Sequence, residues 1–234
     1  MRLIGCVLLL CATLPAAAVL ALRWADPPTT AFMLAHRLEG GTPVRYEWRK
    51  LEQISPSVAI AVVASEDQQF PLHHGFDVGS MQKAIDASDE GRPLRGARTI
   101  SQQTAKNLFL WSGRSFLRKG LEAWLTVYLE ALLPKRRILE IYLNAIELGD
   151  GVYGVEAASR RYLHKPAARL SASEGALFAA VLPNPARLHI QNPSPYVQRR
   201  RDWILGQMSS LGGARYLASI GVPLSASGQS SRAR

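Results

Sequence analysis

Apolar residues recur three or four positions apart along most of the chain, which is typical of helices with one buried face. Proline or glycine follows each repeat, where a helix is expected to stop. Ser171 and Glu174 have capping-box spacing at the start of one repeat. No segment alternates apolar and polar residues and then turns, as a β-hairpin would. The pattern predicts a mainly α protein with helices near 117–132, 135–148, 172–182 and 195–211.

The first segment is strongly hydrophobic. Leu3 to Leu22 is a run of about twenty mostly apolar residues between Arg2 and Arg23, long enough to cross a bilayer as one helix. We expect 1–23 to be a cytoplasmic start and transmembrane anchor, with the bulk of the chain outside the cytoplasm. A cleaved signal peptide is the open alternative, because three alanines in the run could serve as its cleavage site.

Composition divides the remainder into three parts. Residues 24–43 contain the proline- and threonine-bearing stretch DPPTT and are expected to be a connector. Residues 44–215 are long enough for one well-packed domain. The serine- and glycine-rich tail, 216–234, is expected to be disordered.

Charge indicates an anionic partner, and cysteine content excludes some kinds of site. The chain has 28 Lys and Arg against 18 Asp and Glu, a formal net charge of +10. Nucleic acid, an anionic membrane surface and a phosphorylated substrate all fit that charge. The only cysteines, Cys6 and Cys11, lie in the first segment. A disulfide framework and a cysteine zinc site are therefore excluded for the rest of the chain.

A pair of acids ends an aliphatic run. Glu66 and Asp67 follow directly after 58–64, and a carboxylate seated against apolar neighbours has a raised pKa, as a general base requires. The alternative is a solvated pair of charges at a helix end. His73 and His74 lack metal-ligand spacing, so we expect them to position the loop.

Two further stretches carry polar groups at helical spacing. In GARTISQQTAKNLFL, residues 96–110, the hydroxyl of Thr99, the amide of Gln103 and the ammonium of Lys106 share one face of a predicted helix. Such a face suits sugar hydroxyls or phosphate oxygens but also suits plain solvation. In the next stretch, Arg118 and Lys119 precede Glu122. This cluster is either a surface ion pair or a site that handles phosphate, directly or through a metal ion.

Five blocks occur in order along the chain: ASEDQQFPLHHGFD, GARTISQQTAKNLFL, RKGLEAWLTVYLE, KRRILEIYLNAIELGDGVYGVEAASRRYLHK and AAVLPNP. In this order they resemble the signature blocks of the peptidoglycan glycosyltransferases, glycosyltransferase family 51. The resemblance covers roughly Leu51 to Met208. One amino-terminal anchor without a second domain is similar to the monofunctional members. The resemblance implies a lysozyme-like, mainly helical fold with two lobes around a cleft.

The resemblance also implies polymerisation of lipid II, a disaccharide-pentapeptide on undecaprenyl pyrophosphate. Glu66 matches the catalytic base, which would take the proton of the acceptor 4-hydroxyl as that oxygen attacks C1 of the donor sugar with inversion. Glu122 would be the second catalytic carboxylate, orienting cations or holding Mg²⁺ or Mn²⁺. No organic cofactor is implied. The implied substrate-binding residues are Asp67, Phe70, His73, Thr99, Gln102, Gln103, Lys106, Asn107, Arg118 and Lys119.

The implied partners are lipid II, the growing glycan chain, the inner membrane, and cell-division or wall-synthesis proteins, with the catalytic domain on the periplasmic side. Nucleic acid is not expected, because the cations are spread among apolar helices rather than interleaved with aromatic residues. The fourth block is largely structural and the match to the fifth is looser. Residues matching or lying near these two blocks are Lys135, Glu140, Tyr142, Asn144, Arg200 and Arg201.

One position departs from the family pattern. The second block usually reads Gly-x-Ser-Thr, and Arg98 occupies the serine position. This arginine would either strengthen phosphate contacts or disturb a hydroxyl contact. A lytic hydrolase and a non-catalytic recruitment protein are therefore kept as alternatives. A transpeptidase is not expected, since no Lys-Thr-Gly follows the SxxK of 80–83. The stretch 78–95, rich in Gly, Pro and charge, is expected to be a flap over the cleft.

Overall fold

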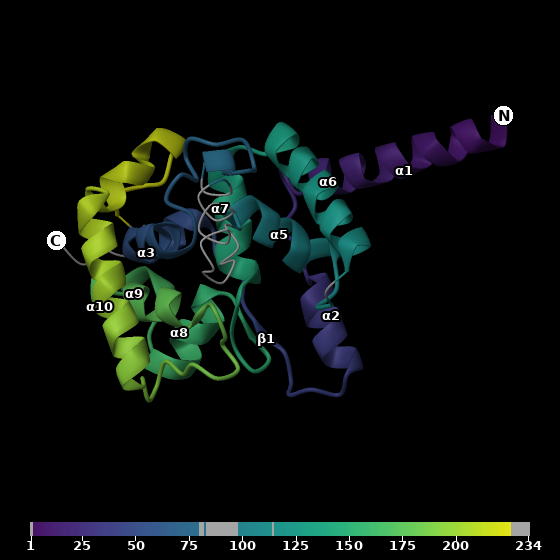
Figure 1. Ribbon diagram of the computed structural model, residues 1–234. Helices are drawn as coiled ribbons and strands as arrows, with labels where there is room; N and C mark the ends of the chain where they lie inside the picture. Colours follow the sequence, from purple (N-terminus) through teal and green to yellow (C-terminus); the bar gives the residue numbers. More distant parts are fainter. Residues whose placement is uncertain (1, 80–81, 83–97, 114, 226–234) are drawn as a thin grey trace.

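The computed structural model describes residues 2–79, 82, 98–113 and 115–225 (Figure 1). The predicted mainly α class is confirmed. The α-helices are α1 (Arg2–Ala21), α2 (Ala31–Leu38), α3 (Pro56–Glu66), α5 (Ile100–Phe109), α6 (Phe116–Leu132), α7 (Lys135–Ala145), α8 (Val155–Leu163), α9 (Ala172–Val181) and α10 (Pro195–Ser210). Short 3₁₀ helices are η1 (Leu51–Gln53), η2 (Ala167–Arg169) and η3 (Gly213–Ile220), and the strands are β1 (Arg45–Tyr46), β2 (Glu147–Gly149) and β3 (Val152–Tyr153).

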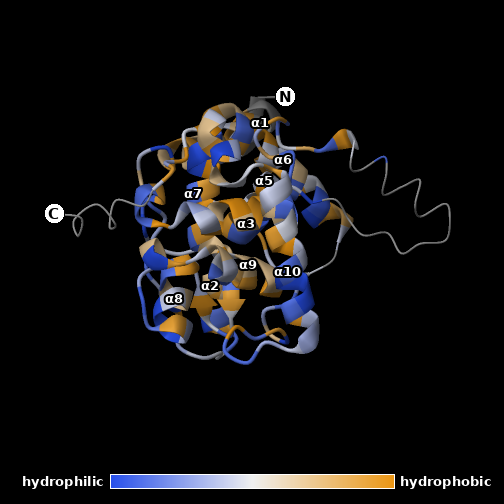
Figure 2. Ribbon diagram, turned by 90° about the vertical axis from the view of Figure 1, so that its left-hand side faces the viewer, coloured by the Kyte–Doolittle hydropathy of each residue, from blue (hydrophilic) through white to orange (hydrophobic). Residues whose placement is uncertain are grey.

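Helix α3 is the centre of one group of helices. Ser55 caps its amino terminus, Pro56 occupies the first helical position, and every residue of 58–64 is buried. Helices α9 and α10 and the 3₁₀ helix η3 pack against α3, and Figure 2 shows hydrophobic residues gathered around α3 and α9. The aliphatic run of the sequence is thus a core helix, and its last residue, Glu66, lies where the core meets a cavity.

Helices α5, α6 and α7 form the second group, with α5 packed against both of the others. Ser115 caps α6, and α7 begins directly after Pro134. Each residue of 137–145 in α7 is buried, so this helix is almost entirely internal. The predicted helices at 117–132 and 135–148 are confirmed, although α7 ends at Ala145, earlier than expected.

The three short strands were not predicted from the sequence. They form one sheet in the order β1-β3-β2, in which β1 runs parallel to β3 and β2 antiparallel to it. Arg45 pairs with Val152, and Glu147 pairs with Tyr153. The sheet sets Glu147 and Tyr153 beside the carboxyl end of α7, where they line a cavity described below.

At the amino terminus, α1 extends away from the body of the molecule (Figure 1). The chain joins the body at its end, where Val19 and Leu22 are buried. The hydroxyl of Tyr128 on α6 also donates a hydrogen bond to the carbonyl of Ala12 at 3.2 Å. Among the described residues, no helix is both long and apolar enough to cross a membrane. The predicted transmembrane anchor is therefore not confirmed.

The segments expected to lack structure are partly ordered. The predicted connector contains α2, which Thr30 caps and which packs against α5. The predicted tail begins too early, because Leu217 and Val222 are buried against the core. Apolar side chains within a Ser- and Gly-rich stretch thus suffice to hold η3 in place. The predicted flap and the SxxK stretch fall mostly outside the described residues.

Candidate active site

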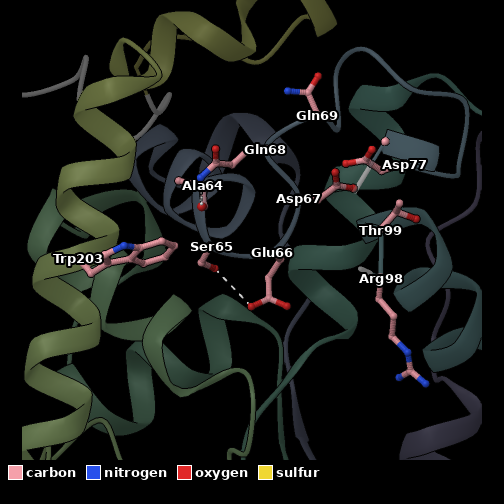
Figure 3. A pocket seen from close by; sticks show the side chains of 11 residues that line it. Ala64, Ser65, Glu66, Asp67, Gln68, Gln69, Asp77, Arg98, Thr99 and Trp203 are labelled. Atoms are coloured by element: carbon pink, nitrogen blue, oxygen red, sulfur yellow. Dashed lines mark hydrogen bonds between the residues drawn. The ribbon is translucent and has the colours of Figure 1, made fainter. Parts of the chain in front are cut away.

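A cavity of about 500 Å³ lies at the carboxyl end of α3 (Figure 3). Glu66 stands at its centre, with Trp203 of α10 on one side and Arg98 on the other. Asp77, from the loop after α3, also lines it. The full lining is Ala64, Ser65, Glu66, Asp67, Gln68, Gln69, Asp77, Gly79, Arg98, Thr99 and Trp203.

The carboxylate of Glu66 is shielded from water without being closed off. Its side chain is 16% exposed. The hydroxyl of Ser65 donates to Oε1 at 3.4 Å, and the amide of Gln103 donates to Oε2 at 3.2 Å. The guanidinium of Arg200, on α10, lies 3.8 Å from Oε1. Burial raises the pKa of Glu66, more than the hydrogen bond from Gln103 and the charge of Arg200 lower it. The predicted base thus has the environment that general base catalysis requires.

A buried tyrosine holds the amide that contacts Glu66. The hydroxyl of Tyr142 on α7 donates to Oε1 of Gln103 at 3.0 Å, which turns the Nε2 of that amide toward the carboxylate. The ring of Tyr142 is 1% exposed, and burial raises the pKa of its hydroxyl well above the ordinary value. The sequence placed Tyr142 in a structural block and gave no signal for this contact.

Asp67 and His73 fix the loop after α3 to the start of α5. The carboxylate of Asp67 accepts from His73 Nε2 at 2.9 Å and from the backbone N–H of Ile100 at 2.9 Å. The backbone N–H of Gly75 donates to His73 Nδ1 at 3.0 Å, so the hydrogen-bond network assigns the ring proton to Nε2. Both side chains are predicted substrate-binding residues, and both are engaged within the protein.

Gly75 is required at this turn. Its φ is +89°, a left-handed conformation that favours glycine, and an added Cβ would lie 2.9 Å from side-chain carbons of Thr126 and Glu130. The glycine thereby lets the loop pass close to α6.

Phe70, Thr99 and Gln102 have structural partners as well. Phe70 is fully buried, with the ammonium of Lys135 4.5 Å from its ring centre, so its predicted direct contact with substrate is not possible in this structure. Thr99 and Gln102 form the capping box of α5. Thr99 Oγ1 accepts from the Gln102 N–H at 3.2 Å and donates to the carbonyl of Gly75 at 2.6 Å. Placing Thr99 on the helix face was wrong, because it is the N-cap.

Lys106 and Asn107 line a second cavity, of about 200 Å³, and Gln103 in its wall donates a hydrogen bond to Glu66 of the first. The ammonium of Lys106 lies 5.0 Å from the ring centre of Phe32 on α2. Burial lowers the pKa of Lys106, and the positive charge of Arg98 lowers it further. Glu147 shares this cavity, and burial raises its pKa. The sequence gave no signal for Phe32 or Glu147.

Arg118, Lys119 and Glu122 form an ion cluster on α6, in which Arg118 and Glu122 are buried and Lys119 is exposed. Arg118 Nη1 and Lys119 Nζ each lie 2.8 Å from a different oxygen of Glu122. Burial alone would raise the pKa of Glu122, but the hydrogen bonds from Lys119 and Arg118 outweigh it and lower that pKa. Glu122 is 0% exposed, so it does not reach the cavity of Glu66. Its contacts agree with one of the two roles expected for it, orienting the cations, and a part in catalysis stays a prediction.

The predicted metal ion does not fit this cluster. Both oxygens of Glu122 already bind a cation of the protein. Within the described ranges, no group of three or more His, Cys, Asp or Glu side chains could hold a metal ion.

Comparison with known proteins shows the family to which the chain belongs. A family model described as Transglycosylase matches residues 34–209. The chain is 54% identical over 217 residues to a biosynthetic peptidoglycan transglycosylase of Xylella fastidiosa, covering 90% of this chain and 89% of the relative. It is 52% identical over 205 residues to one of Xanthomonas campestris, covering 85% and 83%. A Cronobacter sakazakii protein of that name is 59% identical over 172 residues, covering 74% and 71%. The chain belongs to the transglycosylase family.

Proposed function

We propose that this protein is a peptidoglycan glycosyltransferase that polymerises lipid II into β-1,4 glycan strands for the bacterial cell wall. The relatives' names supply the reaction class, and the observation that carries the assignment to this site is the environment of Glu66. This carboxylate lies in a cavity of about 500 Å³, is mostly shielded, and has a raised pKa. A shielded base beside an open cavity suits activation of a sugar hydroxyl.

In the proposed reaction, Glu66 takes the proton of the 4-hydroxyl of the acceptor GlcNAc. The oxygen forms a bond to C1 of the donor MurNAc, and the bond from C1 to the pyrophosphate oxygen breaks with its electron pair on that oxygen. Attack opposite the leaving group inverts C1. Undecaprenyl pyrophosphate departs as an anion, so it needs positive charge rather than a proton.

The described cations supply that charge. Lys106 lines the cavity joined to Glu66 through Gln103, and Arg98 lines the cavity of Glu66 itself. The charges of Arg98 and Arg118 both act on Lys106, which places the three within electrostatic range of one another. Arg98, the departure from the family pattern, therefore adds a cation where the leaving group is proposed to lie.

The nearby cations favour synthesis over a lytic hydrolase. A pyrophosphate leaving group needs positive charge, which Arg98 and Lys106 can provide, whereas a sugar leaving group needs a proton. Apart from Glu66, the described carboxylates lining the cavity are engaged: Asp67 accepts from His73 and from the N–H of Ile100, and Asp77 also has a partner. A purely recruiting protein would not need Glu66 held by three side chains.

Membrane contact is part of the proposal, because the substrate's lipid lies in a bilayer. Apolar side chains are exposed on α1 and α6, and we propose that these helices face the inner membrane from the periplasmic side. The exposed apolar side chains are Leu9, Leu10 and Leu14 of α1 and Phe116, Leu117, Trp124 and Val127 of α6. Binding to other wall-synthesis proteins remains a prediction.

The proposed function is tested by incubating the purified full chain with labelled lipid II and, in a separate reaction, with finished peptidoglycan. We expect polymer and undecaprenyl pyrophosphate from lipid II and no soluble fragments from peptidoglycan. Fragments from peptidoglycan without polymer would support the lytic alternative. A folded protein inert toward both substrates would support recruitment.

A further inference from the structure

We propose that Tyr142 is a positioning residue for the base: it fixes the side-chain amide of Gln103 in the orientation that donates to Glu66. The inference rests on the proposed function, since it assigns Glu66 the role of base. It adds a residue of α7 to a site otherwise built from α3, α5 and α10.

The contacts form a chain across three helices. The hydroxyl of Tyr142 donates to Gln103 Oε1 at 3.0 Å, and Gln103 Nε2 donates to Glu66 Oε2 at 3.2 Å. Gln103 lies on α5 and lines the smaller cavity. In the described contacts, its amide is the only protein group that hydrogen-bonds both the tyrosine and the carboxylate. An ionised carboxylate can only accept, which makes this orientation the one that suits Glu66 as a base.

The opposite orientation suits the protonated acid. A protonated Glu66 would donate to Oε1 of Gln103, and the reversed amide would donate to the hydroxyl oxygen of Tyr142. The phenolic hydrogen would then lose its only protein acceptor in the described structure, and a buried donor without a partner is costly. Tyr142 therefore biases the amide toward the orientation that stabilises the ionised base.

Other charged groups also face Glu66 and are unchanged by a substitution at Tyr142. Asp67 follows it on the chain and raises its pKa, while Arg200 of α10 lowers it. Arg98 and Asp77 line the same cavity. Among the described contacts, removing the tyrosine hydroxyl removes only the hydrogen bond that Gln103 receives.

The test compares pH profiles of lipid II polymerisation for wild type and Tyr142→Phe. Loss of the hydroxyl lets the amide reverse, so the pKa of Glu66 rises and the acidic limb of kcat/KM moves to higher pH. We expect about a threefold to tenfold greater loss of rate below the limb than above it. The matched control is Tyr153→Phe, which removes the hydroxyl of another buried tyrosine lining the smaller cavity, the one that Gln103 and Tyr142 also line. No hydrogen bond joins that hydroxyl to Gln103 in the described structure.

A second measurement does not depend on activity. NMR of the full chain labelled with ¹³C-glutamate, with the Glu66 signal identified by its loss in Glu66→Gln, reports the titration of that carboxyl directly. We expect Tyr142→Phe to move the titration to higher pH and Tyr153→Phe to leave it in place. If both variants titrate like wild type, the inference is wrong even if the enzyme polymerises lipid II.

A double-mutant comparison tests whether Tyr142 acts on Glu66 through Gln103. In a Gln103→Leu background, Tyr142→Phe should shift neither the limb nor the NMR titration further, because the amide that links them is gone. An additional shift of the same size would show that Tyr142 acts by another route and would overturn the proposal. If wild type does not polymerise lipid II but Tyr142→Phe still moves the NMR titration of Glu66, the proposed function is wrong and the positioning role of Tyr142 stands.

Discussion

At the residue scale, the two glutamates predicted to be catalytic occupy opposite environments. Glu66 lines a cavity, and burial raises its pKa, with the amide of Gln103, the charge of Arg200 and the hydroxyl of Ser65 offsetting part of that effect. Glu122 is 0% exposed, with a cation on each oxygen and a lowered pKa. A base must be able to exchange a proton with substrate, and the environment of Glu66 suits that proposed role better than the environment of Glu122.

Glu122→Gln should therefore act mainly on stability. The neutral amide leaves the buried guanidinium of Arg118 without its counter-charge, which costs about 3–5 kcal/mol of unfolding free energy. Urea unfolding of the full chain measures this loss. Glu39→Gln, at an exposed glutamate ending α2, is the matched control and should change stability by less than about 0.5 kcal/mol. Stability equal to wild type with activity abolished would restore a catalytic role for Glu122.

The pH dependence of stability follows from the same cluster. The pKa of Glu122 is lower in the folded than in the unfolded chain, so its contribution is present above the ordinary glutamate value of 4.5 and lost as the pH falls through the folded pKa. We expect urea midpoints to fall more steeply below that pH in wild type than in Glu122→Gln. Parallel curves for the two proteins would contradict the ion cluster.

Arg98 gives a separate prediction at this scale. Arg98→Ser restores the residue usual in the family and removes a cation from the cavity of Glu66. We expect kcat/KM for lipid II to fall about twofold to tenfold, because one charge facing the pyrophosphate is lost. Arg169→Ser removes an equal, exposed charge from a position that lines neither described cavity of the site. An increase in kcat/KM for Arg98→Ser alone would mean that the arginine disturbs the site.

At the element scale, close packing of α9 against α3 sets the position of the base. Gly175 permits this approach: a Cβ there would lie 2.9 Å from the backbone oxygen of Ser57 and 3.1 Å from Cα of Val58. Backbone atoms cannot move aside as a flexible side chain can. The absence of a side chain at Gly175 therefore allows the two helices to approach this closely.

Gly175→Ala should lower the free energy of unfolding by about 1–3 kcal/mol through this overpacking. Gly206→Ala, within α10, is the opposite case, because no atom lies within 4 Å of its added Cβ. There the helix propensity of alanine should raise stability by about 0.5–1 kcal/mol. Urea unfolding of both variants measures the two changes in the free energy of unfolding. Equal effects at the two glycines would contradict the close approach of α9 to α3.

The sequence predicted elements better than it predicted their burial. Periodicity and stop residues located α6 and α10, and the capping box at Ser171 was confirmed. Periodicity also implies a buried face along 117–132, yet Leu117 is 70% exposed, since spacing does not say which neighbour covers a face. Strands of two or three residues are too short to show alternation, so the sheet was missed.

At the scale of the whole molecule, the site is assembled from distant parts of the chain. The proposed base comes from α3, the amide from α5, the tyrosine from α7 and a guanidinium from α10. The ordered blocks predicted Glu66 and Gln103 as site residues. They could not predict that Tyr142 contacts Gln103 across 39 positions, because that contact depends on how α7 packs against α5. Phe32 was missed likewise, since α2 reaches the site only through tertiary packing.

The measurement that tests the central claim most directly is polymer formation from labelled lipid II by wild type, Glu66→Gln and Glu39→Gln. The amide keeps the size of the side chain but cannot accept a proton as a carboxylate does, so we expect Glu66→Gln to lose about a hundredfold to ten-thousandfold in rate. Glu39→Gln should polymerise like wild type, and both variants should unfold cooperatively in urea. Polymer formation by folded Glu66→Gln at the wild-type rate would contradict the assignment of Glu66 as the base.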